Sequence, residues 1–175
     1  AFSPDKPFLM YWAPGGVDGP HDVTAFGADK YKRKFDQGWD TLREEIFARQ
    51  KKLGVIPADC QLTPRPKEVP SWDEMPEGFK PVLRREMEVY AGFMELTDYH
   101  VGRLFETIDK LGVTDNTLIY YIIGDNGASA EGSVNGCFNE LSYFNGLQAL
   151  ETAEYLTAPL DTPGRPASYN QSTAG

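Results

Sequence analysis

The chain has 175 residues, and its 26 Asp and Glu residues outnumber its 17 Lys and Arg residues, which gives a formal net charge of -9. This acidic balance argues against a nucleic-acid-binding protein, because phosphate contacts need a local excess of positive charge. No apolar run approaches the roughly 18 residues that a bilayer span requires. We therefore expect a soluble protein without a membrane segment, and the sequence leaves open whether it is cytoplasmic or periplasmic.

The length of the chain, its first residues and its cysteines bear on its domain organisation and its compartment. A chain of this length can form one domain. It begins at Ala1, and a signal-like segment is absent from its start, which favours an internal piece of a larger protein. Cys60 and Cys137 do not form a metal-binding Cys-x-x-Cys pair, and they leave the redox compartment open.

The first predicted element is a strand over residues 8–13, with the sequence FLMYWA between Pro7 and Pro14. An unbroken apolar run of this length is typical of a strand that is buried on both faces, as in an α/β sheet. The following stretch, 14–26, is rich in Gly, Pro and Asp and contains His21. We expect a loop there, at the edge of the sheet where such proteins often carry their chemistry.

A helix is predicted over residues 41–53. Thr41 and Glu44 have the spacing of a capping box, and Gly54 is placed to end the helix.

The stretch 55–81 contains six prolines and cannot hold a regular element for long. We expect a surface excursion whose ends are held by Trp39 and Trp72.

The strongest periodic signal runs from Leu83 to Leu111, with apolar residues at every third or fourth position. It predicts a long amphipathic helix that ends at Gly112. Asp98 and His100 interrupt the apolar pattern and could form a catalytic pair. We favour a solvated or capping role for them, because polar residues commonly flank an apolar stripe.

A second strand is predicted over residues 117–123, where β-branched and aromatic residues are concentrated. Strand, long helix and strand in this order predict a doubly wound α/β sheet. Beyond it we expect only a short helix near 147–156, and a loop over 163–175.

Asp125 and Asn126 follow this second strand directly and are flanked by Gly124 and Gly127. Carboxylate and amide oxygens suit a hard divalent cation such as Ca²⁺ or Mg²⁺. The alternative is a simple hairpin turn, since Asn-Gly is a favoured corner. Residues 128–136 contain no run that could pair back onto the strand, which favours a metal site.

Several motifs in combination resemble the sulfatase family, and within it the bacterial arylsulfatase branch. Shorter similarities extend over the whole chain. The main motifs are Asp98-x-x-x-Gly102-Arg103-Leu104, Leu111-Gly112, Asp115-Asn116-Thr117-Leu118-Ile119 and Gly124-Asp125-Asn126-Gly127-Ala128-Ser129.

The resemblance implies an alkaline-phosphatase-like α/β fold, of which residues 1–175 would form an internal fragment with part of the sheet, its flanking helices and the excursion 55–81. It also implies hydrolysis of small-molecule sulfate esters with a divalent cation, usually Ca²⁺ with Mg²⁺ as an alternative. Asp125 and Asn126 match two metal ligands of the family, and Gly124 replaces the usual Ser. The nucleophile would be a formylglycine made from Cys or Ser in a Cys/Ser-x-Pro-x-Arg motif.

The chain departs from the family pattern in three respects. The nucleophile motif is absent from it, and so is the active-site lysine, so both are expected in the remainder of a parent chain. Asp18 stands where the family has its catalytic histidine, and a carboxylate there would repel sulfate. His21 matches a second histidine. Either His21 performs the catalytic role or the enzyme is impaired, and the alternative for His21 is a loop histidine with no catalytic role.

Three functions therefore remain open. The first is part of an arylsulfatase that is inactive as the isolated chain. The second is a phosphoester or phosphonate hydrolase of the same superfamily. The third is a non-catalytic sulfatase-like binding module, which Asp18 favours.

Overall fold

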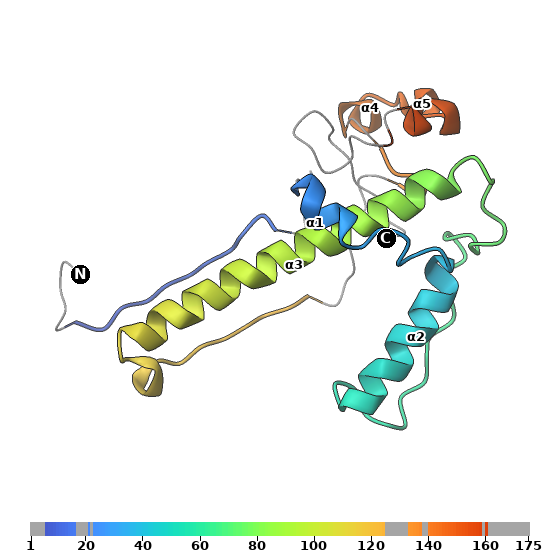
Figure 1. Cartoon of the computed structure of the whole chain (residues 1–175). Coiled ribbons are helices and arrows are strands. Elements are labelled where there is room, and N and C mark those ends of the chain that lie inside the picture. The colour runs from blue at the N-terminus through green and yellow to red at the C-terminus, as the bar shows by residue number, and fades with distance from the viewer. Residues whose placement is uncertain are drawn as a thin grey trace.

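A computed structural model describes residues 6–16, 21, 23–124, 133–137, 140–158 and 160. Over these residues the chain forms helices and extended segments, and it contains no β-strand. The long helix α3 is the axis along which the other elements are arranged (Figure 1). The elements are the helices α1 (Ala25–Asp29), α2 (Gly38–Leu53), α3 (Lys80–Lys110), α4 (Glu140–Phe144) and α5 (Ala153–Thr157), and the 3₁₀ turns η1 (Thr114–Asn116) and η2 (Gln148–Leu150).

The predicted long helix is confirmed as α3, which has 31 residues. It begins three residues before Leu83, at Lys80, because Pro81 in the first turn needs no backbone N–H partner and has a helical φ. It ends before Gly112, whose φ of 68° is left-handed and is accessible to glycine at little cost.

The predicted helix 41–53 is confirmed as α2, which begins at Gly38 and is ended by Gly54 with a φ of 71°. The predicted capping box is wrong, because Thr41 lies inside the first turn. The N-cap residue is Gln37, and its side chain makes no capping hydrogen bond. The first turn is instead covered by the chain that returns from the proline-rich excursion.

Two tryptophans hold the ends of this excursion, as predicted. The ring of Trp39 meets the ring of Trp72 edge to face, with centroids 4.8 Å apart, and Trp39 Nε1 donates a hydrogen bond to the carbonyl oxygen of Pro70 at 3.1 Å. A Cβ at Gly38 would lie 2.1 Å from Trp72 Cγ, so only glycine fits beneath this ring. The buried cluster that they build comprises Trp39, Trp72, Met75, Leu83 and Met87.

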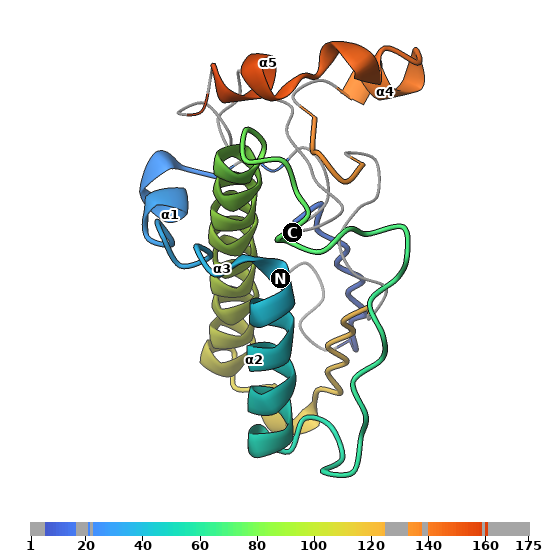
Figure 2. The same cartoon turned by 90° about the vertical axis from the view of Figure 1, so that its right-hand side faces the viewer.

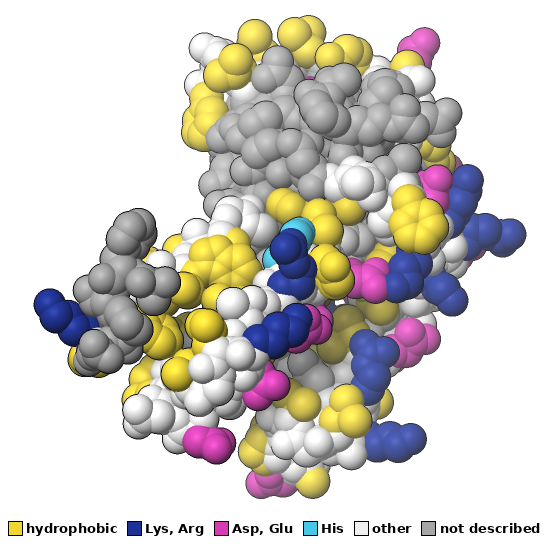
Figure 3. Space-filling model, turned by 60° about the vertical axis from the view of Figure 1, so that its left-hand side comes forward, with side chains coloured by type: hydrophobic (Ala, Val, Ile, Leu, Met, Phe, Trp, Pro, Cys, Tyr) yellow, Lys and Arg dark blue, Asp and Glu magenta, His cyan; other side chains and the backbone are white. Residues whose placement is uncertain are grey.

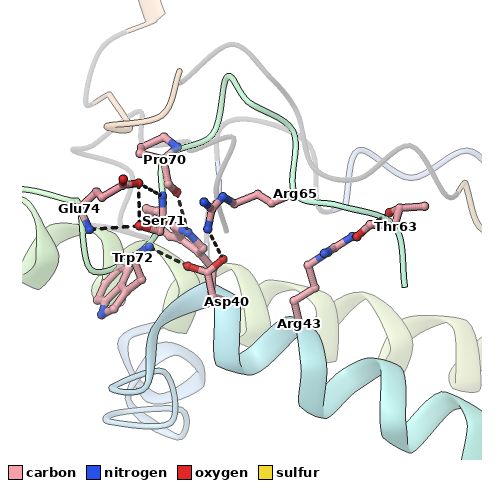
Figure 4. A network of polar contacts seen from close by, with 9 residues as sticks. Asp40, Arg43, Thr63, Arg65, Pro70, Ser71, Trp72 and Glu74 are labelled. Atoms are coloured by element: carbon pink, nitrogen blue, oxygen red, sulfur yellow. Dashed lines mark hydrogen bonds and ion pairs between the residues drawn. The ribbon is translucent and has the colours of Figure 1, made fainter. Parts of the chain in front are cut away.

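A polar network closes the excursion over α2 (Figure 4). The carboxylate of Asp40 accepts hydrogen bonds from the backbone N–H of Trp72 and from Arg65 Nη1, both at 2.7 Å. One turn later, Arg43 Nη2 donates to the carbonyl oxygen of Thr63 at 2.7 Å. Two consecutive turns of α2 therefore bind two separate parts of a segment that has no regular structure of its own.

Helix α1 packs closely against α3. A Cβ on Gly92 of α3 would lie 2.7 Å from the carbonyl oxygen of Gly27. Next to this contact, Val23, Ala28 and Val89 form a second buried cluster. The close approach of the two backbones explains why α3 carries a glycine in its interior, where this residue disfavours a helix.

The two predicted strands are extended segments, 8–13 and 118–124. Both lie on the same side of α3 and run in the same direction, opposite to that of the helix (Figures 1 and 2). In the described part of the chain neither segment makes a backbone hydrogen bond, so the doubly wound sheet stays a prediction. The expectation that 8–13 is buried on both faces is wrong, because its side chains from Phe8 to Trp12 are exposed. No described element covers the far side of the segment.

The predicted short helix near 147–156 is divided into η2 and α5. The division lies at Thr152, which is extended and whose hydroxyl accepts a hydrogen bond from the backbone N–H of Tyr155 at 3.2 Å. Leu156 of α5 is buried. The loop predicted over 163–175 lies outside the described residues. Among the helices that the structure describes, none is long and apolar enough to cross a membrane.

Candidate functional site

The predicted site residues follow the carboxyl ends of the two extended segments. The first described stretch, 6–16, ends at Gly16, and the second segment ends at Gly124; both run toward the middle of α3 (Figure 1). Asp125 and Asn126 come directly after Gly124 and lie outside the described residues, as does Asp18. The structure therefore describes the approach to the predicted metal site without its two ligands.

The loop that leaves the first segment starts in close contact with α3. A Cβ on Gly16 would lie 2.3 Å from Thr97 Oγ1, so a larger residue would force the loop away from the helix. Five positions later, His21 again contacts α3, at Tyr90 and Phe93. Gly16 and His21 thus contact successively earlier turns of α3.

His21 is buried against α3. Its side chain is 2% exposed, and its ring meets the ring of Tyr90 edge to face with centroids 5.3 Å apart. The ring of Phe93 lies 6.2 Å away at a tilt. The same environment raises the pKa of Tyr90, because burial disfavours its phenolate. The structure therefore places His21 among aromatic side chains at the base of the loop.

A network of charged side chains holds the chain that follows His21. Arg85 of α3 forms ion pairs with Asp29 and Glu88, each at 2.9 Å. The second carboxylate oxygen of Glu88 accepts a hydrogen bond from the backbone N–H of Arg33 at 2.8 Å. Arg33 has a φ of 65°, a left-handed conformation that is uncommon for a non-glycine residue. The buried Glu88 carboxylate stabilises this turn.

A second polar contact lies two turns further along α3. Glu95 forms an ion pair with Lys30 and accepts a hydrogen bond from the hydroxyl of Tyr31 at 3.2 Å. The hydrogen bond from Lys30 lowers the pKa of the Glu95 carboxyl. Burial, together with the hydrogen bond to Glu95, raises the pKa of Tyr31. Glu95 of α3 thus holds both Lys30 and Tyr31.

The remaining candidates contribute no site of their own. Within the ranges that the structure describes, no group of three or more His, Cys, Asp or Glu side chains could hold a metal ion. His100 is exposed and its Nδ1 lies 3.2 Å from Arg103 Nη1, which confirms the solvated role expected of it. Cys60 is a half-buried free cysteine, and Cys137 is buried.

The contacts of His21 with Tyr90 and Phe93 could not be predicted from the sequence. Tyr90 and Phe93 belong to the apolar pattern of α3, and nothing in that pattern distinguishes them as partners of a histidine. Gly92 could have been recognised, since a glycine inside a long helix often marks a close approach of two backbones.

Comparisons with known proteins agree with the motifs. The chain is 38% identical over 109 residues to an uncharacterized sulfatase of Schizosaccharomyces pombe, a match that covers 61% of this chain and 19% of the relative. It is 30% identical over 100 residues to an arylsulfatase of Klebsiella aerogenes, covering 57% of this chain and 21% of the relative. The matched region is thus about a fifth of the length of either relative. The Sulfatase family model matches residues 2–168, and the chain therefore belongs to the sulfatase family.

Proposed function

We propose that this chain is part of an enzyme that hydrolyses sulfate esters, and more narrowly of an arylsulfatase. The observation that carries the proposal is the family match over residues 2–168. The similarity to the arylsulfatase of Klebsiella aerogenes supports the narrower assignment. Because the matched region is about a fifth of that relative, the proposal concerns a larger enzyme to which these residues contribute.

Asp125 and Asn126 are the proposed metal ligands of this chain. Their carboxylate and amide oxygens suit Ca²⁺, with Mg²⁺ as the alternative. They follow the extended segment that ends at Gly124, which in a parallel sheet is the edge where ligands bind. A bound cation would neutralise negative charge on the sulfate group.

The formylglycine nucleophile is proposed to lie outside this chain. Cys60 is followed by Gln61-Leu62-Thr63 and Cys137 by Phe138-Asn139-Glu140, so neither stands in the motif from which formylglycine is made. We therefore expect the isolated 175-residue chain to be inactive, with the remainder of a parent chain as its necessary partner.

His21 stays a predicted catalytic residue, with Asp18 at the position of the family histidine. The burial of His21 against Tyr90 and Phe93 supports the alternative, a packing role without a part in catalysis. Asp18 likewise supports a non-catalytic binding module as the second candidate function, because its negative charge would oppose a sulfate group.

Two measurements test the proposal. The first compares hydrolysis of 4-nitrophenyl sulfate, phosphate and phenylphosphonate by the longest polypeptide that the gene encodes and by the 175-residue chain. We expect sulfate hydrolysis by the long polypeptide alone. A preference for the phosphorus esters would assign the phosphohydrolase alternative, and no turnover of any ester would favour the binding module.

The second measurement is a calorimetric titration of the long polypeptide and its variants with Ca²⁺. Asp125→Ala is expected to weaken binding by at least about tenfold, since it removes one charged ligand. Asp115→Ala is the matched control, because Asp115 is an exposed aspartate in η1, the turn that precedes the same extended segment. Equal affinities of both variants and the parent would remove Asp125 from the ligand set.

A further inference from the structure

Glu86 of α3 is a buried carboxylate in an acidic chain. Figure 3 shows acidic side chains at the surface, several of them next to Lys or Arg, whereas Glu86 is 3% exposed. Burial of a glutamate is uncommon and costs free energy, so its neighbours indicate what it does. Glu88, the second buried glutamate of α3, holds the turn at Arg33. Glu86 contacts a different part of the chain.

The carboxylate of Glu86 packs against the backbone at Gly136. A Cβ on Gly136 would lie 2.5 Å from Glu86 Cδ and closer still to both carboxylate oxygens. The carboxylate thus occupies the space in which a side chain of residue 136 would lie. Gly136 is itself buried and has a left-handed φ of 76°. Both its conformation and its surroundings therefore require glycine.

The short segment 133–137 is held on the N-terminal half of α3 by more than this contact. Val134 packs against the buried cluster that contains Trp72, and Cys137 is buried. Ser133 has a left-handed φ of 58°, which is uncommon for a residue other than glycine. The chain therefore makes a tight turn over this segment, and α3 determines where the turn lies.

This turn is where the chain returns from the proposed metal ligands. Asp125 and Asn126 follow Gly124, and the next residue that the structure describes is Ser133. The connection that carries the ligands is thus attached to an extended segment at one end and to α3 at the other. A connection that is fixed at both ends has fewer conformations than one fixed at a single end. Its ligands then lose less conformational entropy when they bind a cation.

We propose that Glu86 is a positioning residue of the metal site. Its carboxylate fixes the chain at Gly136 and so restricts the conformations in which Asp125 and Asn126 meet the cation. The role assigned to Glu86 is to fill the space at Gly136 rather than to bind the metal. The inference rests on the proposed function in one respect, namely that Asp125 and Asn126 are metal ligands.

A pair of glycine variants of the longest polypeptide that the gene encodes tests the contact. Gly136→Ala forces a methyl group into the Glu86 carboxylate and should raise the dissociation constant for Ca²⁺, measured by calorimetric titration, at least about tenfold. Gly146→Ala is the matched control, because Gly146 has a similar φ of 68° but a Cβ there meets open space. It should change the dissociation constant less than about threefold. Equal effects of the two variants would overturn the inference, since left-handed strain alone would explain them.

Two variants of Glu86 separate its shape from its charge. Glu86→Ala removes the contact with Gly136 and should also raise the dissociation constant for Ca²⁺ at least about tenfold. Glu86→Gln keeps the length and branching of the side chain, and its dissociation constant should stay within about threefold of the parent value. An equal loss of affinity in both variants would overturn the inference, because the charge of Glu86 and not its contact would then support cation binding.

The double variant with Glu86→Ala and Gly136→Ala tests whether the two residues act through one contact. Independent effects on affinity multiply, whereas effects of two changes at the same contact do not. The double variant should therefore bind Ca²⁺ within about threefold of the weaker single variant. A loss equal to the product of the two single losses would contradict the proposed contact.

Urea denaturation shows whether each variant is folded under the conditions of the titration. If Gly136→Ala does not fold, the comparison of Glu86→Ala with Glu86→Gln decides. Hydrolysis of 4-nitrophenyl sulfate by the parent polypeptide tests the proposed function separately. The expected changes in Ca²⁺ affinity in a protein that hydrolyses no sulfate ester would refute the proposed function and support this inference. A parent polypeptide that binds no Ca²⁺ would overturn the inference, whichever ester it hydrolyses.

Discussion

The carboxylate of Asp40 accepts a hydrogen bond from the backbone N–H of Trp72 at 2.7 Å, across 32 residues of sequence. The bond joins the first turn of α2 to the end of the proline-rich excursion, and Arg65 binds the other oxygen of the same carboxylate. This acidic side chain thereby helps to hold a segment without regular structure over the tryptophan cluster.

Asp40→Ala is expected to lower the free energy of unfolding by about 1–2 kcal/mol. Hydrogen bonds to a charged group contribute about 1.5–3 kcal/mol, and partial exposure of Asp40 reduces the effect. Urea denaturation followed by tryptophan fluorescence measures the change. Asp59→Ala is the control, because Asp59 is exposed in the same excursion. If both variants lost the same stability, the contacts of Asp40 would contribute no more to stability than the exposed side chain of Asp59 does.

The same carboxylate predicts a dependence of stability on pH. Burial alone would raise the pKa of Asp40, but the hydrogen bonds from Trp72 and Arg65 and the charge of Arg65 lower it below its ordinary value of 3.8. A depressed folded-state pKa stabilises the protein above the unfolded-state value, and this stabilisation is lost as the pH falls through the folded-state value.

The parent protein should therefore be more stable than Asp40→Asn by the largest margin near pH 6. This difference in free energy of unfolding should become smaller as the pH falls below 3.8. Urea titrations of both proteins over this range measure it, and contributions from other carboxylates cancel in the difference. A difference that stayed constant or grew on acidification would contradict the assignment.

Gly92→Ala is expected to destabilise the protein by about 1–3 kcal/mol, the usual cost of overpacking. The new methyl group would lie 2.7 Å from the carbonyl oxygen of Gly27, which is backbone and cannot turn aside. Gly102→Ala on the same helix is the matched control, because its methyl group would meet open space. That substitution should stabilise α3 by about 0.5–1 kcal/mol, and thermal unfolding should move the two midpoints in opposite directions.

Glu88→Ala should cost about 2–3 kcal/mol, since it removes a buried ion pair with Arg85 and the partner of the Arg33 backbone N–H. Glu106→Ala removes an exposed ion pair with Lys110 on the same helix and should change stability by less than about 0.5 kcal/mol. Chemical denaturation measures the loss of unfolding free energy in both variants. Similar losses in the two would contradict this prediction.

His21→Ala is expected to lower the free energy of unfolding by about 2–4 kcal/mol through the cavity left beside Tyr90 and Phe93. His21→Phe keeps an aromatic ring at this position and separates packing from imidazole chemistry. If His21 only packs, the phenylalanine variant of the long polypeptide should retain sulfatase activity within about tenfold. A loss of at least about 100-fold in kcat with a stable fold would assign a catalytic role.

Local pattern predicted the two long helices and did not predict the short helices α1 and α4. The spacing of apolar residues sufficed for α2 and α3, because each buries one face and is followed by a left-handed glycine, Gly54 or Gly112. The capping box failed because the first turn of α2 is covered by residues such as Arg65 and Trp72, which follow Asp40 by 25 and 32 positions. A local motif does not register such distant residues.

The candidate site could be predicted only as a position along the chain. The apolar runs 8–13 and 117–123 indicated where strands would end, and hence where His21 and Asp125 would follow. The burial of His21 could not be predicted, since it depends on how α3 lies against the loop. Pairing of the two segments depends on surfaces that their own sequences do not specify.

Two of the contacts that the chain before α2 makes with α3 are nested, since Arg33 meets Glu88 and the earlier residue Gly16 meets the later residue Thr97. The outer contact closes a smaller additional loop once the inner one has formed, so the entropy of loop closure favours formation of the Arg33 contact first. The Gly16 contact, at the end of the first extended segment, is then the one expected to open first.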